Sequence, residues 1–260
     1  MKIKLVPVFL IGLLLLQPFT TYALTSSETK QAWYEAKNQS REAQEAHRDA
    51  KIAWATDKTG ENNQEVIESG KEALHAALNE VEAWLVWRKL EVEENPEIPD
   101  GLKKAILDDV EANLGKIDEI REEIDGVENR LELGLVFLKM VGKYLELLAD
   151  VARNTGYVWV HIANTYADTV EEYEAKLREA AQGIADNDEI VVKLDLALSD
   201  LESARENILN AEEEYQQVTI PGSPILKFAN GNQYLRIAKN DLISAQTNLK
   251  QVFRLIAGTD

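Results

Sequence analysis

The chain has no cysteine and only three histidines among its 260 residues. The lack of cysteine excludes disulfide bonds, thiolate zinc sites, iron–sulfur clusters, covalently attached c-type haem and thiol nucleophiles. Glycine and proline are also scarce, at 13 and 6 residues, so few turns interrupt the chain. The fold must therefore be stabilised by side-chain packing, without any covalent cross-link.

Basic residues are in short supply as well. The chain has 28 Lys and Arg against 46 Asp and Glu, which gives a formal net charge of −18. Nucleic-acid binding needs surplus cations to displace the counterions of the phosphates, so we expect no nucleic-acid partner. The hydrophobic share of 45% is sufficient for a folded core. The composition thus indicates an acidic, folded protein.

Residues 1–23 are typical of a secretory signal peptide. Two lysines precede an apolar run at residues 5–16, and a small-x-small cleavage pattern ends at Ala23. The run has about twelve residues, against the ~20 that a membrane-spanning helix needs. We therefore expect residues 24–260 to be secreted or held in the cell envelope. An uncleaved membrane anchor is the alternative.

Hydrophobic residues after the signal recur at spacings of three, four and seven, which is the periodicity of α-helices. We therefore predict an all-α fold: an elongated antiparallel helical bundle with coiled-coil-like heptads, forming one domain over residues 24–260. Turn residues divide it into a helical hairpin at 26–94, central helices at 101–185 and a second hairpin at 188–257.

The central segment carries the longest regular pattern. Eleven uncharged residues stand seven apart: Val110, Ile117, Ile124, Leu131, Leu138, Leu145, Ala152, Trp159, Tyr166, Tyr173 and Ala180. Such a repeat keeps one stripe of a helix facing its partners. The segment can break at Gly126 or near Gly156. We favour a break near Gly126, which gives helices at 101–125 and 127–185, and one uninterrupted rod is the alternative.

Both hairpins combine rows of large side chains with rows of alanine. The alanine rows are Ala36, Ala43 and Ala50 in the first hairpin, and Ala197, Ala204, Ala211, Ala238 and Ala245 in the second. Alanine leaves room for the side chains of a facing helix, so two helices can approach closely. We therefore expect two alanine-rich hairpins that flank a long central helix.

Few residues form a pattern that carries chemistry. Glu72 and His75 have the E-x-x-H spacing of carboxylate-bridged di-iron bundles, but these bundles use two copies and the chain has one. The acidic turns near residues 91–100 and 186–189 lack the residue order of an EF-hand loop. No nucleophile-elbow, phosphate-loop or zinc-protease motif occurs. We therefore predict no enzyme activity, no cofactor, no metal site and no small-molecule substrate.

Four tryptophans form a possible interaction patch: Trp33, Trp54, Trp84 and Trp87. If the first two helices are antiparallel, Trp33 lies level with Trp87. Such a patch would engage a partner, whereas core packing is the other interpretation. Asn38 begins the only N-x-S/T sequon and is a possible N-glycosylation site.

Residues 131–148 are the most apolar stretch after the signal. Gly134 and Gly142 stand eight apart, on nearly one face, where a neighbouring helix can approach closely. A helix that is apolar on most sides is usually the centre of a bundle, and we favour that interpretation. The alternative is a membrane-active or lipid-binding segment, as in α-helical pore-forming toxins, although four charged residues interrupt it.

The sequence GLKKAILDDV at 101–110 follows PEIP at 96–99 and continues to IDEI at 117–120. This stretch resembles the turn between the second and third helices of uncharacterised secreted helical-bundle proteins of archaeal cell envelopes. The hairpin ending at 249–254 is similar in style. The resemblance covers residues 63–257. It implies export and an all-helical fold, and it assigns no catalytic or binding residue.

Together these patterns predict a non-enzymatic structural or binding protein of the cell envelope or extracellular space. We expect a protein partner or self-association, because heptad stripes serve a second chain as well as an internal core. A membrane-active protein that uses residues 131–148 is the alternative. The acidic charge disfavours its approach to anionic lipid.

Overall fold

The computed structural model describes residues 27–184 and 187–258. The predicted signal peptide at residues 1–23 lies outside this part of the chain. The described residues form six α-helices and no strand, which confirms the all-α prediction. In chain order these are α1 (Ser27–Thr56), α2 (Gly60–Glu94), α3 (Asp100–Asp125), α4 (Arg130–Ala181), α5 (Asp188–Gln216) and α6 (Pro224–Ala257).

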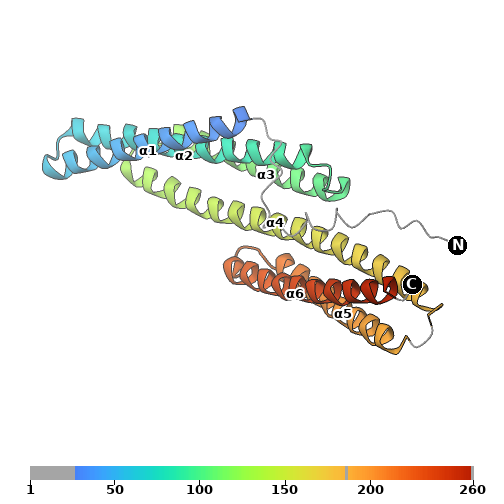
Figure 1. Cartoon of the computed structure of the whole chain (residues 1–260). Helices are drawn as coiled ribbons and strands as arrows, with labels where there is room; N and C mark the ends of the chain where they lie inside the picture. Colours follow the sequence, from blue (N-terminus) through green and yellow to red (C-terminus); the bar gives the residue numbers. More distant parts are fainter. Residues whose placement is uncertain (1–26, 185–186, 259–260) are drawn as a thin grey trace.

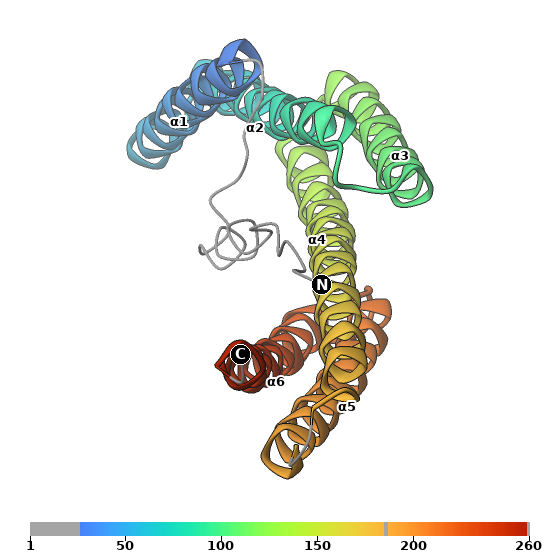
Figure 2. The same ribbon diagram turned by 45° about the vertical axis from the view of Figure 1, so that its right-hand side comes forward.

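Helix α4 is the longest, with 52 residues, and α2, α3, α5 and α6 all pack against it. Helices α2 and α3 pack against its first half, and α1 packs on α2 (Figure 1). The hairpin of α5 and α6 packs against its second half, from the other side. Figure 2 shows the two groups at opposite ends of α4. Within the described chain, α1–α3 do not contact α5 and α6, so α4 alone connects the groups.

The chain turns between α3 and α4 directly after Asp125, close to the predicted break. The side-chain oxygen of Asn129 caps α4 by accepting hydrogen bonds from the backbone N–H groups of Leu131 and Glu132, each at 3.1 Å. Lys71 of α2 donates to the backbone oxygen of Asp125 at 3.0 Å and fixes the turn. The alternative of one uninterrupted rod is therefore wrong. Helix α4 begins three residues later than predicted, because Asn129 is its cap.

Each half of α4 has its own hydrophobic core. The first core joins α2, α3 and the start of α4 around Leu85 and Ile124, which are fully buried. The second core joins the rest of α4 with α5 and α6 around Leu194 and Ile208. The alanine rows of the second hairpin are buried: Ala197, Ala204, Ala211, Ala238 and Ala245. These small side chains let α5 and α6 pack closely.

Tyr215 fixes the position of the second hairpin on α4. Its ring lies between Gly156 of α4 and Gly231 of α6, where an added Cβ would lie 2.4 Å and 2.5 Å from ring carbons. Its hydroxyl donates to Oδ1 of Asn232 at 2.7 Å, and burial raises the pKa of this hydroxyl. Gly156 therefore does not break the helix. It leaves the space that the Tyr215 ring occupies.

We expect Gly231→Ala to lower the free energy of unfolding by about 1–3 kcal/mol, because the new methyl group would overlap the Tyr215 ring. Gly115→Ala on α3 is the matched control, since its added Cβ would meet no atom within 4 Å. Alanine there should stabilise the helix slightly. Urea unfolding followed by circular dichroism measures both changes. Equal stability of the two variants would contradict the placement of Tyr215.

Candidate interaction surface

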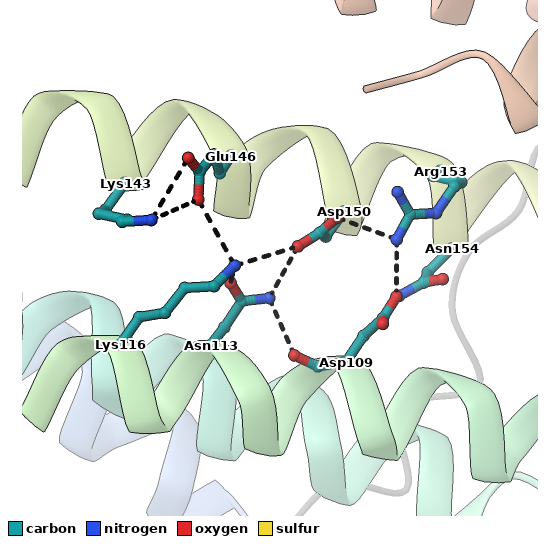
Figure 3. Close-up of polar contacts among 8 residues, drawn as sticks. All are labelled: Asp109, Asn113, Lys116, Lys143, Glu146, Asp150, Arg153 and Asn154. Carbon is teal, nitrogen blue, oxygen red and sulfur yellow. Dashed lines mark hydrogen bonds and ion pairs between the residues drawn. The ribbon is translucent and has the colours of Figure 1, made fainter. Parts of the chain in front are cut away.

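A layer of polar side chains joins α3 to α4 (Figure 3). Its members are Asp109, Asn113 and Lys116 from α3, and Lys143, Glu146, Asp150, Arg153 and Asn154 from α4. Three acidic and three basic side chains balance each other in this layer. Buried polar groups need partners of this kind, because an unpaired one loses its hydration without compensation.

Asp109 and Asp150 bind the polar side chains at one end of the layer. Oδ2 of Asp109 accepts hydrogen bonds from Nη2 of Arg153 at 2.8 Å and from Nδ2 of Asn154 at 3.1 Å. Arg153 also pairs with Asp150 at 2.9 Å, and Asn113 donates to Asp150 at 3.2 Å. These groups bind one another, so the layer fixes the register of α3 on α4. Each charged side chain of the layer has an oppositely charged partner within it.

Each of the three histidines contacts a polar group of another element. The contacts are His47 with Oγ of Ser69 at 3.2 Å, His75 with Oδ1 of Asp125 at 2.9 Å, and His161 with the backbone oxygen of Glu97 at 3.1 Å. The E-x-x-H pair of Glu72 and His75 thus places its histidine against the end of α3. In the described part of the chain, no three His, Asp or Glu side chains are grouped to hold a metal ion.

Three of the four tryptophans of the predicted patch line a groove that runs between α1 and α4 over α2. Trp33 and Trp84 line a cavity of about 320 Å³, and Trp54 lines an adjoining one of about 570 Å³. The rings of Trp33 and Trp87 stack with their centroids 5.3 Å apart, as the antiparallel arrangement predicts. The Arg130 guanidinium lies over the Trp54 ring at 3.6 Å. We call the two adjoining cavities the α1–α4 groove.

Asn38 lies exposed on α1, whereas Ser40, the third residue of its sequon, is 1% exposed. The Ser40 hydroxyl accepts a hydrogen bond from Nε2 of Gln44 at 3.1 Å. Glycosylation of Asn38 stays a prediction. It would require the sequon to be accessible before α1 packs on α2.

The first half of α4 carries a row of exposed hydrophobic side chains. Leu131, Leu135 and Leu138 are 74%, 58% and 66% exposed. The row continues through five further exposed residues: Phe137, Val141, Tyr144, Leu145 and Leu148. We call these eight residues the α4 apolar face. Among the described helices, none combines the length and hydropathy that a bilayer-spanning segment requires.

The direction of this face follows from helix geometry. At about 100° per residue, the exposed row of Leu131 and Leu138 points about 160° away from Leu133 and Leu147, which are buried in the first core. The same row points within about 30° of Val160, which is buried against the second hairpin. The α4 apolar face is therefore the continuation of the surface that α5 and α6 cover.

The prediction that residues 131–148 form the centre of a bundle is wrong for this face. Helices α2 and α3 cover only the opposite side of α4, and burial by the second hairpin begins at Ala149. The burial of the heptad row therefore varies along the chain: the row is buried at Ile117, exposed at Leu138 and half-buried at Trp159. The second hairpin is too short to cover the remaining half, since α5 and α6 have 29 and 34 residues.

The α4 apolar face and the α1–α4 groove adjoin each other. Phe137 and Tyr144 belong to the face and also line the groove. The sequence indicated the tryptophans and the apolar stretch separately, and no local pattern in it shows that they are neighbours. Comparison of the chain with protein-family models, characterised proteins and solved structures finds no match.

We expect Arg153→Met to lower the free energy of unfolding by about 1.5–3 kcal/mol, the usual value of hydrogen bonds to charged groups. The substitution leaves Asp109 and Asp150 without their shared cation. Lys176→Met, on the same helix, removes an exposed pair with Glu172 and should change stability by less than about 0.5 kcal/mol. Thermal unfolding compares the two variants. Similar values would show that the polar layer does not join α3 to α4.

The stability of the first hairpin should depend on pH through His47. Burial, followed by the charge of Lys51, lowers the pKa of His47 below its usual range. A histidine with a lowered folded-state pKa contributes its full stability above the unfolded pKa of about 6.5, and this contribution is lost as the pH falls through the folded pKa. We expect His47→Gln to flatten the decrease in stability below about pH 6.5. Parallel pH profiles for the variant and the parent would contradict this.

Proposed function

We propose that the protein is a non-enzymatic structural or binding protein of the cell envelope or extracellular space, and that it holds a protein partner on the α4 apolar face. The exposure of that face is the observation that carries the proposal. Monomeric soluble proteins rarely leave contiguous apolar patches of more than a few hundred Å² open to water. Eight neighbouring exposed hydrophobic residues on one helix are therefore best explained as a surface that is covered in use.

The form of the surface favours a helical partner. It is a straight strip along α4, and the equivalent strip on the second half of α4 is covered by helices. The α1–α4 groove borders the strip and adds the aromatic side chains of Trp33, Trp54 and Trp84. Aromatic residues are enriched in protein–protein interfaces. The tryptophan patch and residues 131–148 thus belong to one proposed docking region.

The proposed location of the protein outside the cytoplasm is supported by the signal-like sequence at residues 1–23 and by the resemblance to envelope proteins. The lack of enzyme activity is also part of the proposal. It is supported by the polar layer, where Asp109, Asp150 and Arg153 are bonded to one another.

The alternative is a membrane-active protein that lays the same face on lipid. The formal net charge of −18 opposes approach to an anionic bilayer. The lysines beside the face do not offset this charge, because Lys139 pairs with Glu123 and Lys143 pairs with Glu146. A protein partner is therefore the better-supported occupant.

A photo-crosslinking amino acid at Leu138, in cells that express and export the full chain, tests the proposal. We expect protein adducts from this position. The same amino acid at Val192 on α5 is the matched control, because Val192 is 58% exposed and lies outside the α4 apolar face. Adducts with lipid alone would support the membrane-active alternative. An equal, weak yield from both positions would show that nothing docks on the face.

A further inference from the structure

Packing within the molecule does not account for Gly134 and Gly142. Each lies inside α4, where glycine costs about 1 kcal/mol relative to alanine. An added Cβ would meet no atom within 4 Å at either position. Gly156 and Gly231 differ, because they make room for Tyr215. Glycines on an exposed helix surface allow another backbone to approach closely.

Along the α4 apolar face, a strip of seven residues centred on Leu138 has the same order of side chains in both directions. Phe137, Tyr144 and Leu148 lie outside this strip, because their mirror positions hold Lys139, Glu132 and Glu128. The matching pairs are Leu131 with Leu145, Gly134 with Gly142, and Leu135 with Val141, at seven, four and three residues from Leu138. None of these residues is charged. The strip is therefore symmetric about Leu138, both in the positions of its large side chains and in those of its glycines.

A closed two-fold dimer needs such symmetry, because its axis brings one surface patch against the same patch of the second chain. Two α4 helices packed antiparallel about Leu138 would bring Leu131 of each chain opposite Leu145 of the other. The glycine pair would meet in the same way. We propose that the partner on the α4 apolar face is a second copy of this chain, packed antiparallel about Leu138. This rests on the function proposed above, in which a protein covers the face.

The area available fits a stable pair. A fully exposed large side chain has about 150–250 Å² of surface. With exposed fractions from 37% to 74%, the eight residues of the face together offer on the order of 800 Å² per copy. A standard protein–protein interface buries about 800 Å² from each partner. The exposed area of the face is thus of the order that a specific dimer buries, and the large residues of the strip around Leu138 supply the greater part of it.

The position of the face also suits a second α4. The tip of the α5–α6 hairpin lies against the middle of α4 (Figure 1), and the second copy would continue the hairpin's line along the helix. The tip itself exposes three hydrophobic residues: Ile220, Ile225 and Leu226. In an antiparallel pair, the start of α4 in the second copy would lie beside this tip. Two exposed apolar regions would then be covered by one association.

The net negative charge of the two copies would oppose their approach at long range. It would not weaken the contact between the two uncharged strips. Each copy carries a formal net charge of −18, whereas the symmetric strip is uncharged. Salt screens repulsion between exposed charges over about 10 Å at 0.1 M. We therefore expect the dimer to become tighter as salt is added. An interface built on ion pairs would respond in the opposite direction.

The lack of native cysteine allows a direct test of the arrangement. The full chain is expressed in an exporting host, and N-terminal sequencing of the purified protein establishes whether residues 1–23 are retained. Under mild oxidation, Leu138→Cys should give a disulfide-linked dimer, because residue 138 lies on the axis. A mixture of Leu131→Cys and Leu145→Cys chains, one carrying a size tag, should give the mixed dimer. Val192→Cys is the control and should stay monomeric.

Each cysteine variant alone distinguishes antiparallel from parallel packing. In the antiparallel pair, the two copies of residue 131 would stand about 21 Å apart along the helices. Disulfide formation needs Cα atoms within about 7 Å, so Leu131→Cys alone should not cross-link. A strong homodimer from Leu131→Cys would overturn the antiparallel arrangement.

Light scattering measures the association without any cross-link. We expect twice the mass of the purified chain for the parent protein and the monomer mass for Leu138→Glu, where the chain mass is 29.2 kDa when residues 1–23 are retained. Val192→Glu is the matched control and should remain dimeric. Leu138 is 66% exposed, so its variant should keep the helical circular dichroism of the parent. A monomeric parent at high concentration and high salt overturns the dimer, including when residues 1–23 are retained.

The photo-crosslinking experiment separates this failure from failure of the proposed function. If the parent is monomeric while Leu138 captures a different protein, the dimer is wrong and a docking function remains. If Leu138 captures only lipid, both proposals fail. Adducts of dimer size that contain only this chain support both.

Discussion

The division of one helix between two cores determines the rest of this structure. The first half of α4 packs through Leu133 and Leu147, and the second half packs through Val160 and Ala167, which point in a nearly opposite direction. The other helices have 26 to 35 residues, against 52 in α4, so no neighbour accompanies it along its whole length. The α4 apolar face is the part of the helix surface that this mismatch leaves exposed.

Much of the helical organisation could be read from the sequence, because residues with distinct backbone preferences mark the turns. Asp125-Gly126 ends α3, and Ser223-Pro224 begins α6. Gly156 has a similar local context to Gly126 but lies inside α4, because Tyr215, distant in sequence, fills the space beside it. Local preference indicates where a chain is able to turn. A long-range packing contact decides whether it does.

The sequence shows which residues are candidates for the interaction surface, but it does not show which of them stay exposed in the fold. Periodicity shows that a helix has an apolar stripe, and the stripe at Ile117 looks the same as the stripe at Leu138. Only the lengths and register of the neighbouring helices decide which stretch is covered. The stacking of Trp33 on Trp87 followed from hairpin geometry. The contact of Trp54 with Arg130 could not be predicted in this way, because it joins elements far apart in the sequence.

The single connection through α4 also has a mechanical consequence. Helices α1–α3 do not touch α5 and α6 in the described part of the chain, so the two groups are linked in series. A load applied between the hairpins would pass through the backbone of one helix as tension, bending or torsion. Each core would hold one end of this helix in place through side-chain packing. In the first core, the pairing of Asp109 with Arg153 resists sliding of α3 past α4. The second core opposes sliding through the Tyr215 ring, held between two glycines.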